Sequence, residues 1–176
     1  WGLLVASMGW GLLYATRVMR RQVSLWWLLG VHRFLGVMAI VFTGVHVIAL
    51  VLDRFIDFSF ADVFIPFASS RHPIATGWGI IAMYLLLAIE VTSLLKARLP
   101  YHWWRAVHLA SYPLFALATV HALSAGTDSR AVLGDGLAIS IGAISIALAL
   151  IGLDRRAGAD PRRRPIDGLR IPKATR

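Results

Sequence analysis

Long apolar stretches alternate with short basic or polar connectors along most of the chain. Most of these stretches reach the roughly 20 residues that a helix needs to cross a bilayer, and the first is shorter. The pattern predicts an all-α fold, a polytopic transmembrane helical bundle of about five spans, at residues 1–15, 25–52, 74–95, 106–124 and 131–153. We interpret residues 53–73, where phenylalanines alternate with acids, as a connector that lies on the membrane surface.

Composition supports a membrane protein. Of the 176 residues, 58% are hydrophobic and 15% charged, whereas a soluble domain is typically about 45–50% apolar and about 25% charged. We expect one bundle over residues 1–153. Residues 154–176 are rich in arginine, proline and glycine and cannot pack a core, so we expect a disordered basic tail. The absence of cysteine from the sequence excludes disulfides, iron–sulfur clusters and thiolate zinc sites in this chain.

The net charge of +9 would suggest nucleic acid as a partner of a soluble protein. Here membrane topology explains the basic residues instead, because fifteen of the 18 lie on one side of the predicted bundle and three on the other. The positive-inside rule then places the tail in the cytoplasm and residues 53–73 outside, with no role for nucleic acid. We expect an integral protein of a bacterial inner membrane, whose basic tail contacts anionic lipid or, in a second interpretation, an acidic redox protein.

Four histidines lie inside the apolar stretches, where imidazole is costly and tends to mark function. His32 and His46 belong to one predicted span, and His108 and His121 to another. Within each span the two histidines are separated by about 20 Å along the helix axis. The topology places His32 with His108 near the cytoplasmic end, and His46 with His121 nearer the outside.

Two facing imidazoles at one level are what the two axial positions of a haem iron require. Two such levels predict two stacked haems and a path for electrons across the membrane. Alternatively, the histidines are structural polar groups or line a metal or proton path. A zinc or iron transport site is disfavoured, since Glu90 is the only acid well inside a predicted span.

The spacing of the second histidine pair raises a question of phase. His32 and His46 are two heptads apart and share a helix face. The thirteen-residue spacing of His108 and His121 is poorly in phase on an ideal helix. A kink at Pro113 or a rotation of one haem against the other would absorb the misfit, and the sequence leaves both open.

The segments LLGVHRFLGVMAIVFTGVHV and LLLAIEVTSLLKARLPYHWWRAVHLASYPLFALATVHALSAGTD resemble the ferric reductase-like transmembrane domain. That family includes ferric reductases, NADPH oxidases and bacterial haem-bearing subunits of the MsrQ type. The resemblance covers residues 25–153. It implies two b-type haems, one ligated by His32 with His108 and the other by His46 with His121. It also implies electron transfer from a cytoplasmic reductant to an acceptor on the far side.

Full-length oxidases and reductases of the family also carry a C-terminal flavin and nicotinamide domain, which a tail of residues 154–176 cannot supply. The family also usually shows six spans. We therefore expect a haem electron-transfer subunit of an oxidoreductase, supplied by a separate flavoprotein or by a membrane quinol. A membrane anchor or interaction subunit of a larger complex, with one or both haem sites lost, is the alternative.

Two arginines flank the cytoplasmic haem level. Arg33 and Arg105 are candidate partners for haem propionates, because guanidinium pairs bidentately with carboxylates, or they only fix the helix ends. For Glu90 we predict a local hydrogen bond or a neutral carboxyl, with a proton relay beside the inner haem as the other interpretation. His72 and His102 are expected at the membrane interface rather than as ligands.

Overall fold

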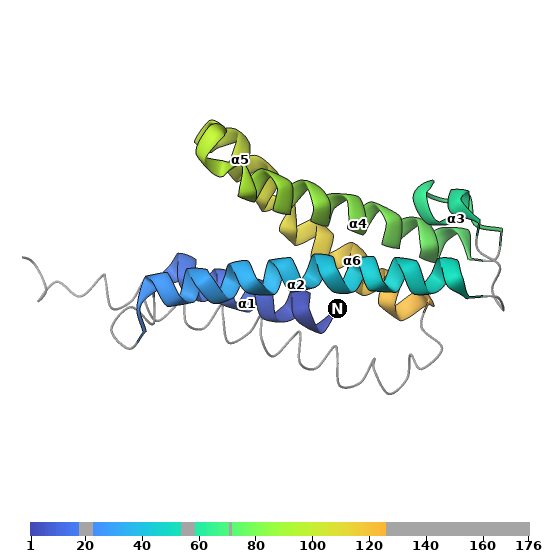
Figure 1. The fold of residues 1–176 in the computed structure, drawn as a ribbon, viewed down its shortest axis with the longest axis horizontal. Coiled ribbons are helices and arrows are strands. Elements are labelled where there is room, and N and C mark those ends of the chain that lie inside the picture. Colours follow the sequence, from blue (N-terminus) through green and yellow to red (C-terminus); the bar gives the residue numbers. More distant parts are fainter. Residues whose placement is uncertain (18–22, 54–58, 71, 126–176) are drawn as a thin grey trace, which may run out of the picture.

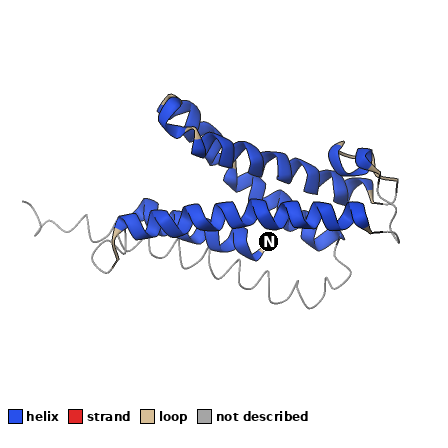
Figure 2. Cartoon of the chain, in the orientation of Figure 1, coloured by secondary structure: helices blue, strands red, loops and turns tan. Residues whose placement is uncertain are grey.

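The computed structural model describes residues 1–17, 23–53, 59–70 and 72–125, and within these ranges the chain is helical with no strand (Figures 1 and 2). In chain order the elements are α1 (Gly2–Thr16), α2 (Leu25–Leu52), α3 (Phe60–Phe64), α4 (Pro73–Leu94), the 3-10 turn η1 (Lys96–Arg98), α5 (Tyr101–Leu109) and α6 (Ser111–Ala125).

Three of the described helical stretches are long and apolar enough to cross a membrane: Leu25–Leu52, Pro73–Leu94 and Tyr101–Ala125. Gly2–Thr16 is apolar but shorter. The prediction of an all-helical membrane protein is therefore confirmed. The predicted span at residues 131–153 and the basic tail at 154–176 lie outside the described residues, so the count of five spans and the domain division remain predictions.

The main helices of the described residues are arranged as two pairs. Helix α1 packs along α2, and α4 packs along α6, while the two pairs meet through smaller contacts between α2 and α4 and between α1 and α6 (Figure 1). The first turn of α1 is fixed to α6, because the Trp1 indole N–H donates to the Thr119 hydroxyl at 3.0 Å. The Trp1 ring also stacks on Phe115.

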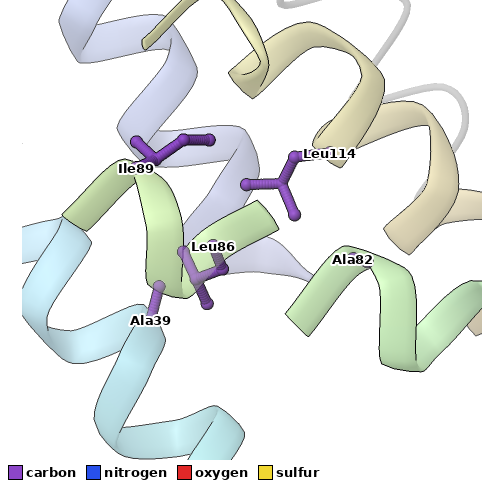
Figure 3. Packing of buried hydrophobic residues seen from close by; sticks show 5 residues of the cluster. All are labelled: Ala39, Ala82, Leu86, Ile89 and Leu114. Carbon is purple, nitrogen blue, oxygen red and sulfur yellow. The ribbon is translucent and has the colours of Figure 1, made fainter. Parts of the chain in front are cut away.

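A small core joins the two pairs at mid-length. It consists of Ala39 from α2, Ala82, Leu86 and Ile89 from α4, and Leu114 from α6 (Figure 3). Alanines at such a contact let helix backbones approach closely, as in other membrane bundles. Many other large apolar side chains point outward; Trp26, for example, is 85% exposed. Such exposure is costly in water but is expected where side chains face lipid.

We name the two ends of the bundle by what they carry. The basic end is where α2 begins and α4 leads through η1 into α5, and it carries Arg17, Lys96, Arg98 and Arg105. The α3 end is where α2 stops and α4 begins. There, Ser59 and Asp62 form a capping box that starts α3 and holds the pKa of Asp62 below its ordinary value. The Tyr84 hydroxyl of α4 donates to the Phe64 carbonyl at 2.6 Å.

The span predicted at residues 106–124 is divided in two. Helix α5 already begins at Tyr101, which corrects the predicted start, and it ends at Leu109. Pro113 has no N–H for the Leu109 carbonyl, and its ring would clash there in a continuous helix. The Ala110 N–H instead bonds the Val107 carbonyl at 3.0 Å, and α6 restarts at Ser111. The helix is therefore interrupted at Ala110, three residues before Pro113, which agrees with the proline kink as one of the two explanations offered for the phase misfit.

Candidate functional site

The four histidines of the apolar stretches come together in two pairs. His32 of α2 faces His108 of α5, with ring centroids 6.0 Å apart and ring planes at 79°. His46 of α2 faces His121 of α6, with centroids 6.3 Å apart and planes at 73°. We call them the basic-end pair and the α3-end pair. Each pair joins the α1–α2 half of the bundle to the α4–α6 half, as the spacing along the two spans predicts.

Both separations fit a haem iron held between two imidazoles. An imidazole–metal bond is about 2 Å long, so two imidazoles on opposite sides of one ion have ring centres about 6 Å apart. Within the described ranges, no group of three His, Cys, Asp or Glu side chains is placed to hold a metal ion. The site thus offers ligands two at a time, which is the number of axial ligands a six-coordinate haem iron takes from the protein.

Helix α1 orients His32. The Nδ1 of His32 donates to the backbone carbonyl of Ser7 at 3.0 Å, which leaves Nε2 for a metal. One turn further along α1, Gly11 lies against the same ring. A β-carbon at Gly11 would sit 3.0 Å from the ring carbon Cε1 of His32. The short first helix is therefore part of the site and fixes the ring of one candidate ligand.

Helix α4 orients His121 in the same manner. Its Nδ1 donates to the backbone carbonyl of Ala75 at 2.8 Å. One turn later, Gly79 faces the ring, and a β-carbon there would lie 2.5 Å from Nδ1. Ala75 and Gly79 thus form one face of α4 that accepts a hydrogen bond and leaves room for the imidazole.

His108 is held by stacking. The Trp104 ring, one turn earlier on α5, lies parallel to the His108 imidazole, with centroids 5.1 Å apart and planes at 21°. The ammonium nitrogen of Lys96 lies 3.9 Å from the centre of the Trp104 ring. The Nδ1 of His108 is buried and finds no hydrogen-bond partner among the described residues. His46, by contrast, is the most exposed member of the two pairs.

A cavity of about 60 Å³ lies beside the basic-end pair, bounded by α1, α2, α4, α5 and α6. Its polar lining consists of Ser7, His32, Glu90, His108 and Ser111. The carboxyl of Glu90 reaches from α4 to α2 and lies against Gly36, where a β-carbon would collide with Oε1 and lie 2.9 Å from Cδ. The acid singled out in the sequence is therefore placed beside the basic-end histidines.

The remaining candidates lie outside these pairs. Arg33 and Arg105 are exposed, and Arg105 donates from Nη1 to the Tyr101 hydroxyl at 3.3 Å on its own helix. Their role as propionate partners stays a prediction. His72 precedes α4 and is exposed, and the exposed His102 ring lies 5.9 Å from that of Trp103.

The groups that orient the histidines were not predicted from the sequence. The Ser7 and Ala75 acceptors are backbone carbonyls, which carry no signature in a sequence. Gly11 and Gly79 could have been noticed, since glycine inside a helix is unfavourable by about 1 kcal/mol relative to alanine and often has a packing reason.

Residues 3–119 match the family described as ferric reductase like transmembrane component. No curated protein and no solved structure matches the chain. The matched segment includes α1, which our resemblance from residue 25 onward had left out, and it ends two residues before His121. With most of its length matched and its helices apolar enough to span a bilayer, the chain belongs to the ferric reductase like transmembrane components, integral membrane domains of transmembrane electron transfer.

Proposed function

We propose that this chain binds two b-type haems, one between His32 and His108 and the other between His46 and His121. Electrons pass through the two haems from the basic end of the bundle to the α3 end. The observation that supports this most directly is the presence of two facing imidazole pairs, with centroids 6.0 and 6.3 Å apart, on helices that run through both levels. A bound haem would supply a one-electron ferric–ferrous couple at each level.

The chain's own residues supply orientation and a dry environment. The Ser7 and Ala75 carbonyls select the tautomer of His32 and His121 that leaves Nε2 for iron. The apolar side chains of the helices exclude water. Because the surroundings then have a low dielectric constant, they influence the reduction potential of an enclosed haem. Arg33 and Arg105 pair with haem propionates at the basic end.

The basic end faces the cytoplasm in this proposal, because it carries most of the basic residues of the described connectors. The electron donor is a separate flavoprotein or a membrane quinol that delivers electrons near His108. The acceptor lies on the α3 side, in the periplasm if the membrane is a bacterial inner membrane.

The haem content of the purified protein tests the proposal. We expect two haems per chain and reduced spectra of low-spin b type. Replacing His46 or His121 by alanine should leave one haem per chain, and replacing His32 or His108 should remove the other. His72→Ala and His102→Ala, which change exposed histidines outside the pairs, are the matched controls and should keep both.

A colourless protein would contradict the proposal and favour a membrane anchor or interaction subunit. A protein that keeps two haems after His121→Ala would contradict the ligand assignment. If the four histidines instead line a metal or proton path, the wild type and all four alanine variants should lack haem absorbance.

A further inference from the structure

Phe67 occupies a turn position that usually belongs to glycine. The Ala68 N–H bonds the Ile65 carbonyl at 3.2 Å, which closes a tight turn with Pro66 second. Phe67 is third and has φ 65°, in the left-handed region. A turn with proline second and a positive φ third matches type II, where glycine is preferred at the third position because a bulky side chain is strained there. The sequence therefore keeps a large ring where the backbone favours no side chain.

The Phe67 ring covers the backbone of α4. It lies against Gly77, where a β-carbon would collide with it, and it meets the Trp78 ring nearly at right angles with centroids 5.6 Å apart. Glycine inside a helix is itself unfavourable relative to alanine. Phenylalanine in the turn and glycine in the helix are thus two locally unfavourable choices that form one close contact. Such local conflicts are expected at functional or strained sites.

Gly77 belongs to the turns of α4 that orient His121. The Ala75 carbonyl accepts the hydrogen bond of His121, and Gly79 leaves room for the imidazole. At about 100° per residue, Gly77 lies about 160–200° around the helix from these two residues. The first turns of α4 are therefore held between the His121 imidazole on one side and the Phe67 ring on the other.

This start of α4 depends on contacts from outside the helix. Its N-cap, His72, makes no side-chain capping hydrogen bond, and Ala75 is only the third residue of the helix. Helix ends fray, because their first N–H groups have no partner within the helix. Residues 59–70 attach to α4 a second time where Tyr84 donates to the Phe64 carbonyl. Helix α3 contacts both α2 and α4, so this segment connects the two helices at the α3 end (Figure 1).

We propose that Phe67 is a positioning residue for the α3-end haem, because it fixes the turn of α4 whose carbonyl orients His121. The inference rests on the proposed function, since it takes His121 as a ligand of haem iron. Without the ring, the Ala75 carbonyl is free to move, and the imidazole moves with it. The ligands of the basic-end haem are His32 and His108, which lie on α2 and α5, so that haem should not respond.

The test uses the full chain with His108→Ala, which keeps only the α3-end haem, and adds Phe67→Ala or Phe67→Gly. Two measurements are made: the rate of haem transfer to an excess of a haem-binding acceptor protein, and the EPR spectrum of the ferric haem, which depends on the angle between the imidazole planes. We expect about tenfold faster transfer and a shifted EPR signal in both variants. Phe67→Tyr keeps the ring and should restore wild-type values.

The glycine variant separates positioning from a role in the turn alone. Glycine suits the left-handed position better than phenylalanine, so a residue that only shapes the turn predicts an unchanged or more tightly held haem in Phe67→Gly. A residue that acts through its ring predicts faster transfer. Phe60→Ala is the matched control, since it removes a phenylalanine of α3 that is 73% exposed, and it should leave both measurements unchanged.

Gly77→Ala tests the same contact from α4. Its methyl would displace the Phe67 ring, so it should reproduce the effect of Phe67→Ala. The collision is absent once the ring is removed. The double variant should therefore be no worse than Phe67→Ala alone, because residues in contact are not additive. Additive effects would show that each residue acts by another route and would overturn the inference.

Wild-type transfer and EPR signals in Phe67→Ala would overturn the inference while leaving the two-haem proposal intact. An equal disturbance of the basic-end haem, measured in a His121→Ala background, would overturn it as well, because the effect would not be specific to His121. A colourless wild-type protein would instead refute the proposed function itself.

Discussion

His121 donates a hydrogen bond from Nδ1 to the backbone carbonyl of Ala75, 2.8 Å away on α4. This contact fixes both the tautomer and the plane of the imidazole before any ligand binds. His32 has the same relationship with Ser7 of α1 at 3.0 Å. One histidine of each pair is thus oriented by a neighbouring helix, and a glycine one turn away leaves room for its ring.

Gly79→Ala should abolish the α3-end haem and keep the other. The added methyl would lie 2.5 Å from Nδ1 of His121, so the ring must leave its position. We expect about one haem per chain, measured as the haem-to-protein ratio. Gly44→Ala is the control, because it lies two residues before His46 with nothing within 4 Å, and it should retain both haems. Two haems in Gly79→Ala would show that this close contact does not position His121.

Gly11→Ala should have a milder effect on the basic-end haem. Its methyl would lie 3.0 Å from Cε1 of His32, a contact that a small ring movement can relieve. We expect the haem to be retained but to transfer roughly tenfold faster to an excess of a haem-binding acceptor protein, in line with the weakening that disturbed ligand orientation causes. Gly9→Ala, on the same helix with open space around it, should transfer haem at the wild-type rate.

The sequence was sufficient for the features that depend on spacing. Two matched histidine pairs on apolar segments predicted which rings meet, because rise per residue fixes their levels. The phase misfit of His108 and His121 indicated either a kink at Pro113 or a rotation of one haem, and the structure interrupts the helix at Ala110. These features follow from covalent geometry and helix periodicity alone.

Features that depend on tertiary contact could not be read from the chain. Helix α5 starts at Tyr101, five residues before the predicted span. From the sequence alone, KARLPYHWWR was interpreted as a polar connector, because the packing of this segment against α4 is a tertiary contact. The approach of Glu90 to Gly36 joins residues of two helices that no local pattern pairs. The backbone carbonyls of Ser7 and Ala75, which accept the hydrogen bonds of His32 and His121, likewise leave no pattern in the sequence.

Trp104→Leu should loosen the basic-end haem, because the indole supports the His108 ring by stacking at 5.1 Å. Leucine keeps the apolar character but removes the flat surface. We expect partial loss of this haem and a broader spectrum of the remainder, with the α3-end haem unchanged. Trp103→Leu is the matched control, since Trp103 is 63% exposed and contacts His102 instead. Equal haem loss in both variants would indicate a general effect of removing interfacial tryptophan.

Pro113→Ala tests whether the helix break sets the second pair of ligands. At about 100° per residue, His32 and His46 lie about 40° apart around α2, whereas on one continuous helix His108 and His121 would lie about 140° apart. The break between α5 and α6 removes that constraint and lets both rings face α2.

Alanine at position 113 restores an N–H for the Leu109 carbonyl and favours a continuous helix. We therefore expect Pro113→Ala to hold no more than one haem per chain, while its helical content by circular dichroism stays the same or rises. Pro73→Ala is the control, because a proline in the first turn of α4 interrupts no internal hydrogen bond. If Pro113→Ala keeps two haems with wild-type spectra, the surrounding helices hold the break without the proline, and α4 rather than Pro113 determines the ligand geometry.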